Sequence, residues 1–148
     1  MKKILVLLVS LLCFCGCSTK KTTTTVCKLD TMGMLDSMEI ISEGDTVTNL
    51  KETVTMKWAD FEIETEDDKA LLETTMMDVF EVLVDIDGIE ISSEKTEEAL
   101  NIIIKMDIVN GDLDAMKEIG VLIFDEGAVS ISLEKSIEGL KETGYTCE

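Results

Sequence analysis

Hydrophobic and polar residues alternate along two stretches of the chain, and this alternation is typical of half-buried β-strands. The pattern predicts three strands within residues 26–58, the last of them a long strand from Thr46 to Trp58. Glu52 interrupts the apolar row of that long strand. Farther along, a short strand over Ile89 to Ser93 precedes the clearest alternation in the chain, from Leu100 to Ile108.

Helical periodicity follows each group of strands. Thr65 and Asp68 have the spacing of an N-cap with an acid three residues on, which predicts a helix beginning there. Its apolar residues form one continuous stripe: Leu72, Met76, Val79, Phe80 and Leu83. A short helix is expected between Asp112 and Gly120, and a last helix follows the capping residue Ser132.

The order of elements is βββαββα(β)α, in which the bracketed strand is an irregular one over residues 121–131. Strands joined by tight turns favour antiparallel pairing, and helices with one apolar stripe need a sheet to pack against. The sequence therefore predicts a single α+β domain over residues 26–148, an antiparallel β-sheet packed on one face by helices.

The first sixteen residues differ from the rest of the chain. Lys2 and Lys3 precede an apolar run from Ile4 to Phe14, which is about half the length that a membrane-spanning helix needs. This arrangement predicts a cleaved signal peptide over residues 1–16, and therefore an exported protein. The alternative is a buried N-terminal helix or strand.

The next residues, Phe14-Cys15-Gly16-Cys17-Ser18, resemble the lipobox of bacterial lipoproteins. In that class the cysteine after the cleavage site follows a small residue and receives a diacylglyceryl group. Cys17 follows a glycine, whereas the two earlier cysteines follow bulky residues, so Cys17 is the expected lipidation site. Residues 17–25 then form a lipidated cysteine and flexible tether at the outer leaflet of the cell membrane, or elsewhere in the cell envelope.

Charge excludes several classes of function. The chain has 31 Asp and Glu against 13 Lys, with no Arg and no His, and its net charge is −18. Nucleic acid is not an expected partner because phosphate contacts need a basic surface. Without histidine there is no His-based catalytic triad and no His-ligated zinc. Anionic lipid head groups repel so acidic a domain, so attachment to the membrane would depend on the covalent lipid.

Two cysteines, Cys27 and Cys147, remain in the predicted domain, one near each end. An even pair in an exported domain favours a disulfide, which would close a loop of about 120 residues. Two free thiols or a thiolate metal site are the alternatives, although two thiolates without histidine partners make a poor metal site.

Three segments carry potential metal ligands, and each has a simpler structural interpretation. The acidic segment from Glu62 to Asp68 offers the carboxylates that calcium prefers, but first-turn acids also stabilise a helix N-terminus. The segment from Asn110 to Asp114 resembles half of an EF-hand loop, in which Asp112 is better explained as a helix cap. The third segment holds Met32, Met34 and Met38. These thioethers have a spacing suited to Cu(I), but their shared parity predicts a buried strand face. No metal or cofactor is assigned.

No catalytic residues can be assigned either. Among 31 acids some carboxylates pair by chance, so the acid pair of a glycoside hydrolase cannot be inferred from the count. Serine nucleophiles lack a histidine base, and neither Lys95 nor Lys105 has a catalytic motif beside it. An enzyme is therefore not expected, and a hydrolase is the weakest of the function classes considered.

The C-terminal residues Val129 to Cys147, VSISLEKSIEGLKETGYTC, resemble the end of the YehR-like lipoproteins, a family without assigned function. Its members also share a lipobox, a Thr- and Lys-rich tether, an early cysteine near Cys27 and a Gly-Asp turn like Gly44-Asp45. The resemblance implies an α+β domain and supports pairing of Cys27 with Cys147, and it brings no catalytic residues.

These observations together predict a membrane-anchored, extracytoplasmic binding or interaction module, holding a small ligand or an envelope protein. An acidic, calcium-binding envelope protein is the alternative.

Overall fold

The computed structural model describes residues 21–118 and 130–148, which form strands and helices in an α+β arrangement. The strands are β1 (Thr22–Thr31), β2 (Met34–Glu43), β3 (Thr46–Lys57), β4 (Ile89–Lys95), β5 (Ala99–Asp107) and β6 (Thr146–Cys147). The helices are the 3-10 helix η1 (Trp58–Phe61) and the α-helices α1 (Glu66–Val79), α2 (Glu81–Val84), α3 (Leu113–Glu118) and α4 (Leu133–Glu142). The predicted fold class is confirmed.

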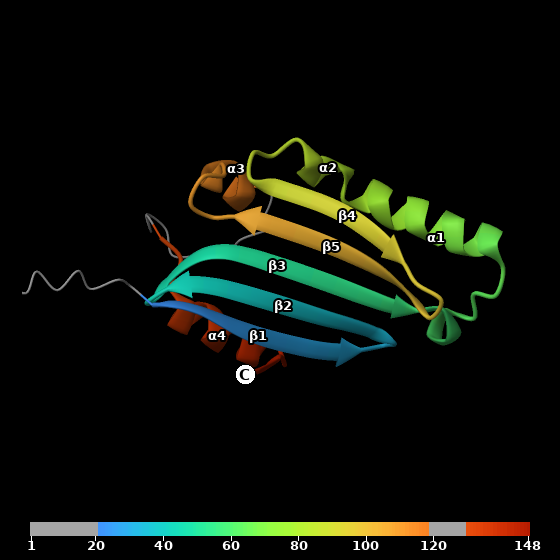
Figure 1. Cartoon of the computed structure of the whole chain (residues 1–148), viewed down its shortest axis with the longest axis horizontal. Coiled ribbons are helices and arrows are strands. Elements are labelled where there is room, and N and C mark those ends of the chain that lie inside the picture. Colours follow the sequence, from blue (N-terminus) through green and yellow to red (C-terminus); the bar gives the residue numbers. More distant parts are fainter. Residues whose placement is uncertain (1–20, 119–129) are drawn as a thin grey trace, which may run out of the picture.

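The strands form one antiparallel sheet in the order β4-β5-β3-β2-β1-β6 (Figure 1). Three hairpins build most of it, joining β1 to β2, β2 to β3 and β4 to β5. The first hairpin turns at Met32 and Gly33, which both have positive φ, and the second turns at Gly44, whose φ is 64°. The connection from β3 to β4 carries η1, α1 and α2, and β5 returns to pair with β3.

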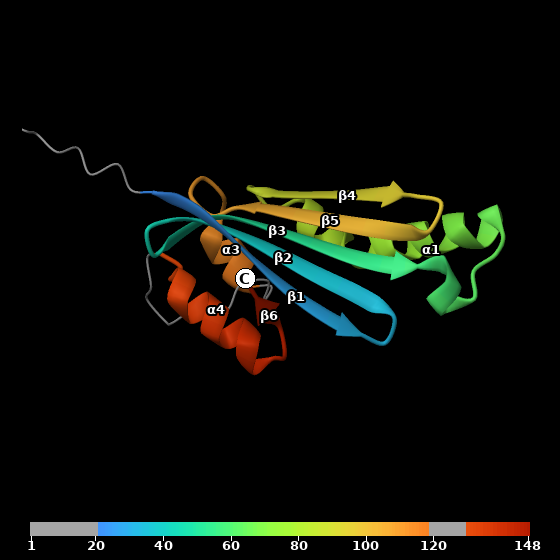
Figure 2. The same ribbon diagram turned by 60° about the horizontal axis from the view of Figure 1, so that its bottom comes forward.

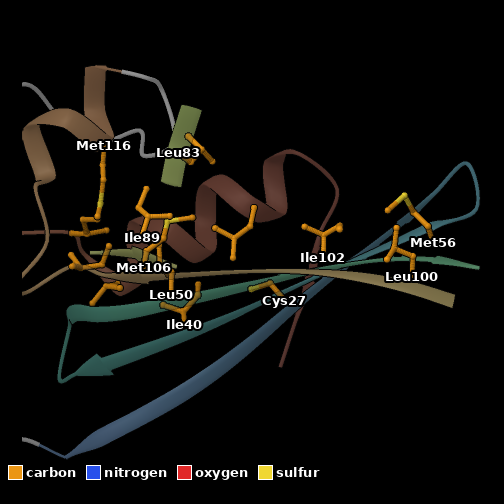
Figure 3. Packing of buried hydrophobic residues seen from close by; sticks show 14 of the residues in the cluster. Cys27, Ile40, Leu50, Met56, Leu83, Ile89, Leu100, Ile102, Met106 and Met116 are labelled. Carbon is orange, nitrogen blue, oxygen red and sulfur yellow. The ribbon is translucent and has the colours of Figure 1, made fainter. Parts of the chain in front are cut away.

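The α-helices lie on one face of this sheet, as predicted (Figures 1 and 2). Alternation along the strands directs their buried side chains toward that face. Ile40, Leu50 and Met106 are cross-strand neighbours there and are at most 9% exposed. Leu83 of α2 and Met116 of α3 approach the same side chains from the helical layer (Figure 3). The core therefore lies between one face of the sheet and the helices.

The first helix begins as predicted but ends earlier. The Thr65 side-chain oxygen accepts a hydrogen bond from the Asp68 backbone N–H at 3.1 Å. The helix ends at Val79, and Phe80 separates it from α2. Because helical register stops there, Phe80 and Leu83 reach the core from a separate turn. Val79 remains outside with 62% of its surface exposed, so its assignment to the buried stripe was wrong.

The sheet also begins earlier than predicted. β1 starts at Thr22, and residues 22–25 pair with residues 40–43 of β2. Threonine is β-branched and favours strands, so a free edge of β2 is enough to recruit these residues. They belong to the sheet rather than to a flexible tether. The predicted signal peptide and the predicted lipidation site Cys17 lie outside the described residues.

Helix α4 is held at its N-terminus by the turn between β2 and β3. Ser132 caps the helix as predicted and accepts a hydrogen bond from the Lys135 N–H. Asp45 accepts two more, from the Glu134 N–H at 3.0 Å and from the Ser132 hydroxyl at 2.8 Å. Of the predicted irregular strand, residues 121–129 lie outside the described part, and Ile131 accepts a hydrogen bond from Val47. Within the described residues, every helix is too short or too polar to cross a membrane.

Candidate functional site

The helical layer leaves part of the central sheet incompletely covered. Helix α1 contacts β4 and β5, whereas α4 contacts β6, so the two helices lie near opposite edges of the same sheet face. On β5, between them, Ile102 and Ile104 are at most 3% exposed. Their neighbours on β2 and β3 are only half-buried: Met34, Asp36, Met38, Glu52 and Val54. We call these five residues the floor strip.

Two carboxylic acids meet at the centre of the floor strip. Asp36 of β2 pairs in register with Val54, and Glu52 of β3 pairs with Met38, so the two acids are diagonal neighbours on one face. Burial, followed by the nearby charge of Asp36, raises the pKa of Glu52 to about 7. Close to neutral pH, Glu52 therefore exists in both protonated and ionised forms.

Tyr145, just before β6, completes this group. Its hydroxyl donates a hydrogen bond to Asp36 Oδ2. Burial and the two carboxyl groups raise the pKa of Tyr145 above its usual value, so the phenol stays a donor. The other oxygen, Asp36 Oδ1, is buried and has no hydrogen-bond partner unless a protonated Glu52 supplies one. The site is thus short of positive charge and of donors.

A disulfide joins the two ends of the domain beside this group, between Cys27 and Cys147 as predicted. The two cysteines are register partners of β1 and β6, and Cys27 also pairs with Met38 of the floor strip. Val26 and Glu148 exchange two backbone hydrogen bonds next to them, at 3.1 and 2.9 Å. The disulfide therefore fixes the short segment that carries Tyr145 against the edge of the sheet.

A cleft of about 900 Å³ lies away from the floor strip, where residues 84–90 meet β3 and β5. Lys51 and Lys105 line it and are direct cross-strand partners, an arrangement that is unfavourable for like charges. Each is paired with a carboxylate: Lys51 lies 2.8 Å from Glu39, and Lys105 lies 3.7 Å from Glu90, which also lines the cleft. Both ammonium groups already face acids, so the floor strip is the stronger candidate site.

The segments with potential metal ligands are placed as structural elements. Met32 lies at the tip of the first hairpin and is 92% exposed, whereas Met34 and Met38 pack against the core, so the predicted common buried face for the three was wrong for Met32. The positive φ required by the tight turn removes Met32 from the alternation. Asp112 accepts a hydrogen bond from the Ala115 N–H at 3.0 Å and caps α3.

The acidic segment from Glu62 to Asp68 leads into α1 and supplies its first-turn acids. In the part of the chain that the structure describes, no three Asp, Glu or Cys side chains are grouped in a way that could hold a metal ion.

Sequence reasoning did not bring Asp36, Glu52 and Tyr145 together. The one available signal was that Glu52 interrupts an apolar row, and Asp36 likewise stands between Met34 and Met38 on β2. Two acids on the buried parity of consecutive strands are compatible with a shared site. Their diagonal register, and the approach of Tyr145 from more than ninety residues away, depend on the tertiary fold.

Comparison with protein families identifies the chain. A family model described as "Protein of unknown function (DUF1307)" matches residues 21–146. The protein belongs to the DUF1307 family. No relative was found among curated proteins.

Two solved structures share the fold of this DUF1307 chain. The NMR structure of the Escherichia coli YehR protein has a TM-score of 0.69 at 16% identity, covering 86% of this chain and 91% of that one. The NMR structure of a protein from Streptococcus pneumoniae TIGR4 has a TM-score of 0.59 at 11% identity, covering 100% of this chain and 98% of that one. At these identities the likeness establishes the fold alone. It agrees with the YehR-like resemblance of the C-terminal residues.

Proposed function

We propose that this protein is an extracytoplasmic binding module, anchored by lipid on Cys17, that holds a small organic cation on the floor strip. The observation that carries the proposal is the placement of Asp36 and Glu52 in a half-buried strip whose other members are Met34, Met38 and Val54. Buried carboxylates are retained at a cost unless they are paired, and a bound cation would pair them.

The surroundings favour an organic cation over calcium. Calcium takes six to eight oxygen ligands, whereas this site offers two carboxylates and a phenol that is already a donor to Asp36. An amine or quaternary ammonium group needs fewer oxygens, and the apolar side chains on either side would contact its hydrocarbon part. Asp36 Oδ1, buried and unpaired, would gain a charged partner.

The acid pair gives less support to a hydrolase. Glu52 and Asp36 are close enough to share a hydrogen bond. The two carboxyl groups of glycoside hydrolases stand about 5 Å or more apart, which leaves room for the sugar and the attacking water. The geometry here is suited to neutralising one positive charge.

The proposed cation is tested by comparing choline with its neutral isostere 3,3-dimethylbutanol, using NMR chemical shifts of the ¹⁵N-labelled domain. Choline should perturb residues of the floor strip and Tyr145, and the neutral compound should not. Because a cation favours the ionised form of Glu52, choline affinity should rise between about pH 6 and pH 8.

Glu52→Gln should abolish the choline effect, while Glu43→Gln, an equal charge change at the exposed end of the same β2 strand that carries Asp36, should leave it intact. Equal responses to choline and the neutral compound, or no response to either, would overturn the proposed ligand.

Anchoring is tested separately with the full chain expressed in a bacterium. The wild-type protein should partition with membranes and carry the mass of lipid on Cys17. Cys17→Ala should leave the protein unlipidated and release it from the membrane fraction after export. Membrane association that persists in Cys17→Ala would contradict the lipid anchor while leaving the cation site untouched.

A further inference from the structure

Exposed apolar side chains are concentrated on one helical segment. In residues 21–118 and 130–148, seven large apolar side chains are exposed, and four of them lie between residues 71 and 84. Leu71 is 66% exposed, Val79 62%, Val82 65% and Val84 56%. Single exposed apolar residues are ordinary on protein surfaces, but such a concentration on two short helices needs an explanation.

Three of these residues follow one another along α1 and α2. Leu71 and Val79 lie on α1, about 80° apart around the helix axis, and Val82 lies on α2 just beyond the break at Phe80. Leu72, Met76 and Phe80 of the same segment pack against the core, whereas Leu71, Val79 and Val82 remain exposed. We call Leu71, Val79 and Val82 the outer stripe. Helix α1 follows the β4 side of the molecule, away from α4 (Figure 1).

The outer stripe is not explained by the stability of the domain. Valine is a poorer helix former than alanine, leucine, glutamate or lysine, because its branched side chain loses rotamer freedom. At positions 79 and 82 it therefore weakens the helix without burying surface in the core. Both the choice of valine and its exposure are explained if another molecule binds to this surface and buries it.

The charges around the outer stripe indicate which kind of partner could bind there. The segment from residue 66 to 87 carries eight Asp and Glu and a single lysine, Lys69. Lys69 is paired with Glu66 at 2.7 Å and lies 5.6 Å from the centre of the Trp58 ring, so it belongs to the helix start. Asp78 stands within the outer stripe, and Asp67 and Asp85 stand at its two ends. A second copy of this chain or an anionic membrane would bring like charges together.

We infer that the outer stripe is a docking site for a basic, amphipathic helical segment of a partner protein. Apolar residues of that segment would cover Leu71, Val79 and Val82, and lysines or arginines on either side would face the acids of α1 and α2. This surface is distinct from the floor strip, so either proposal can fail without the other.

The test uses a short helical peptide of leucine and lysine with the leucines on one face, and a scrambled peptide of the same composition. Both carry the same charge, so general attraction to an acidic protein is common to them. The amphipathic peptide should bind at least about tenfold more tightly by calorimetry, and it should shift the NMR signals of α1 and α2. Val79→Ser with Val82→Ser should reduce its affinity to that of the scrambled peptide. The control Val109→Ser, at an exposed valine outside the segment, should not.

The NMR spectrum of each variant checks its folding. A second variant, Val79→Lys with Val82→Lys, keeps good helix formers at both positions, and its added positive charges should repel a basic peptide. Three results would overturn the inference: equal affinity for the two peptides, peptide shifts that map elsewhere, or unchanged binding in both variant pairs. Concentration-dependent dimerisation lost in the variants would assign the outer stripe to a second copy instead, and would equally overturn it.

Discussion

Glu52 lies beside Asp36 on a mostly apolar face of the sheet, and that position changes its ionisation. Burial disfavours its charged form, and the neighbouring carboxyl of Asp36 disfavours it further, so the pKa of Glu52 rises from 4.5 to about 7. A raised acid pKa means that the folded state binds the proton more tightly than the unfolded chain does. This contribution to stability is complete below the unfolded pKa and is lost as pH rises through the folded one.

Glu52→Gln should therefore stabilise the protein only at higher pH. The amide keeps the shape of the protonated acid and stays neutral, so the free energy of unfolding at about pH 8 should exceed that of the wild type by roughly 1–3 kcal/mol. At about pH 4 the two proteins should differ little. Urea denaturation at both pH values measures this, with Glu43→Gln as the control. A constant difference across the range would contradict the assigned pKa.

At the scale of elements, the α-helices are held to the sheet by apolar contacts, and α4 is also capped by a residue from another part of the chain. Asp45 is the clearest case, because it lies in the β2–β3 turn and accepts hydrogen bonds at the N-terminus of α4. Those hydrogen bonds, from the Glu134 N–H first, lower the pKa of Asp45. The contribution of Asp45 to folding stability should therefore be present above its unfolded pKa and lost as pH falls through its lower, folded pKa.

Asp45→Ala should loosen α4 and lower the melting temperature at neutral pH by a few degrees. The difference in melting temperature between wild type and variant should become smaller at strongly acidic pH, where the Asp45 carboxyl is protonated and accepts hydrogen bonds less well. Calorimetry at two pH values tests this against Asp30→Ala, an exposed change on β1. Equal melting temperatures for the Asp45 and Asp30 variants would show that the hydrogen bonds of Asp45 do not stabilise α4.

At the scale of the whole molecule, the chain closes on itself through the Cys27–Cys147 disulfide. The sequence separation of 120 residues spans nearly the entire described domain. β6 contributes only two residues to the sheet and follows directly on Tyr145. The disulfide thus holds a segment that backbone pairing alone would hold weakly, and that segment supplies one member of the candidate site.

Replacing both cysteines with serine should lower the free energy of unfolding by about 4–5 kcal/mol in the chain-entropy description of a loop this long. Amide hydrogen exchange should rise first in β6 and around Tyr145, before the β2–β3 hairpin. Denaturation of the oxidised, reduced and double-serine proteins provides the comparison. Matching midpoints for all three would show that the crosslink does not stabilise the fold.

The sequence by itself determined the elements whose causes are local. Alternation over residues 26–58 and 100–108 predicts the main strands, and Thr65, Asp112 and Ser132 predict where three helices begin, because capping involves neighbouring residues. Pairing of the two cysteines was also predictable, since only one pair remained in the domain.

Only the tertiary structure decided which strands pair at the edges of the sheet and which parts of its face the helices cover. Residues 22–25 join β1 because β2 offers them a free edge, and Val79, the last residue of α1, stays exposed. The floor strip exists because α1 and α4 lie near opposite edges of one sheet face and leave the centre of β2 and β3 half-buried. Burial of Glu52 and its contact with Asp36 follow from that placement, which no local pattern encodes.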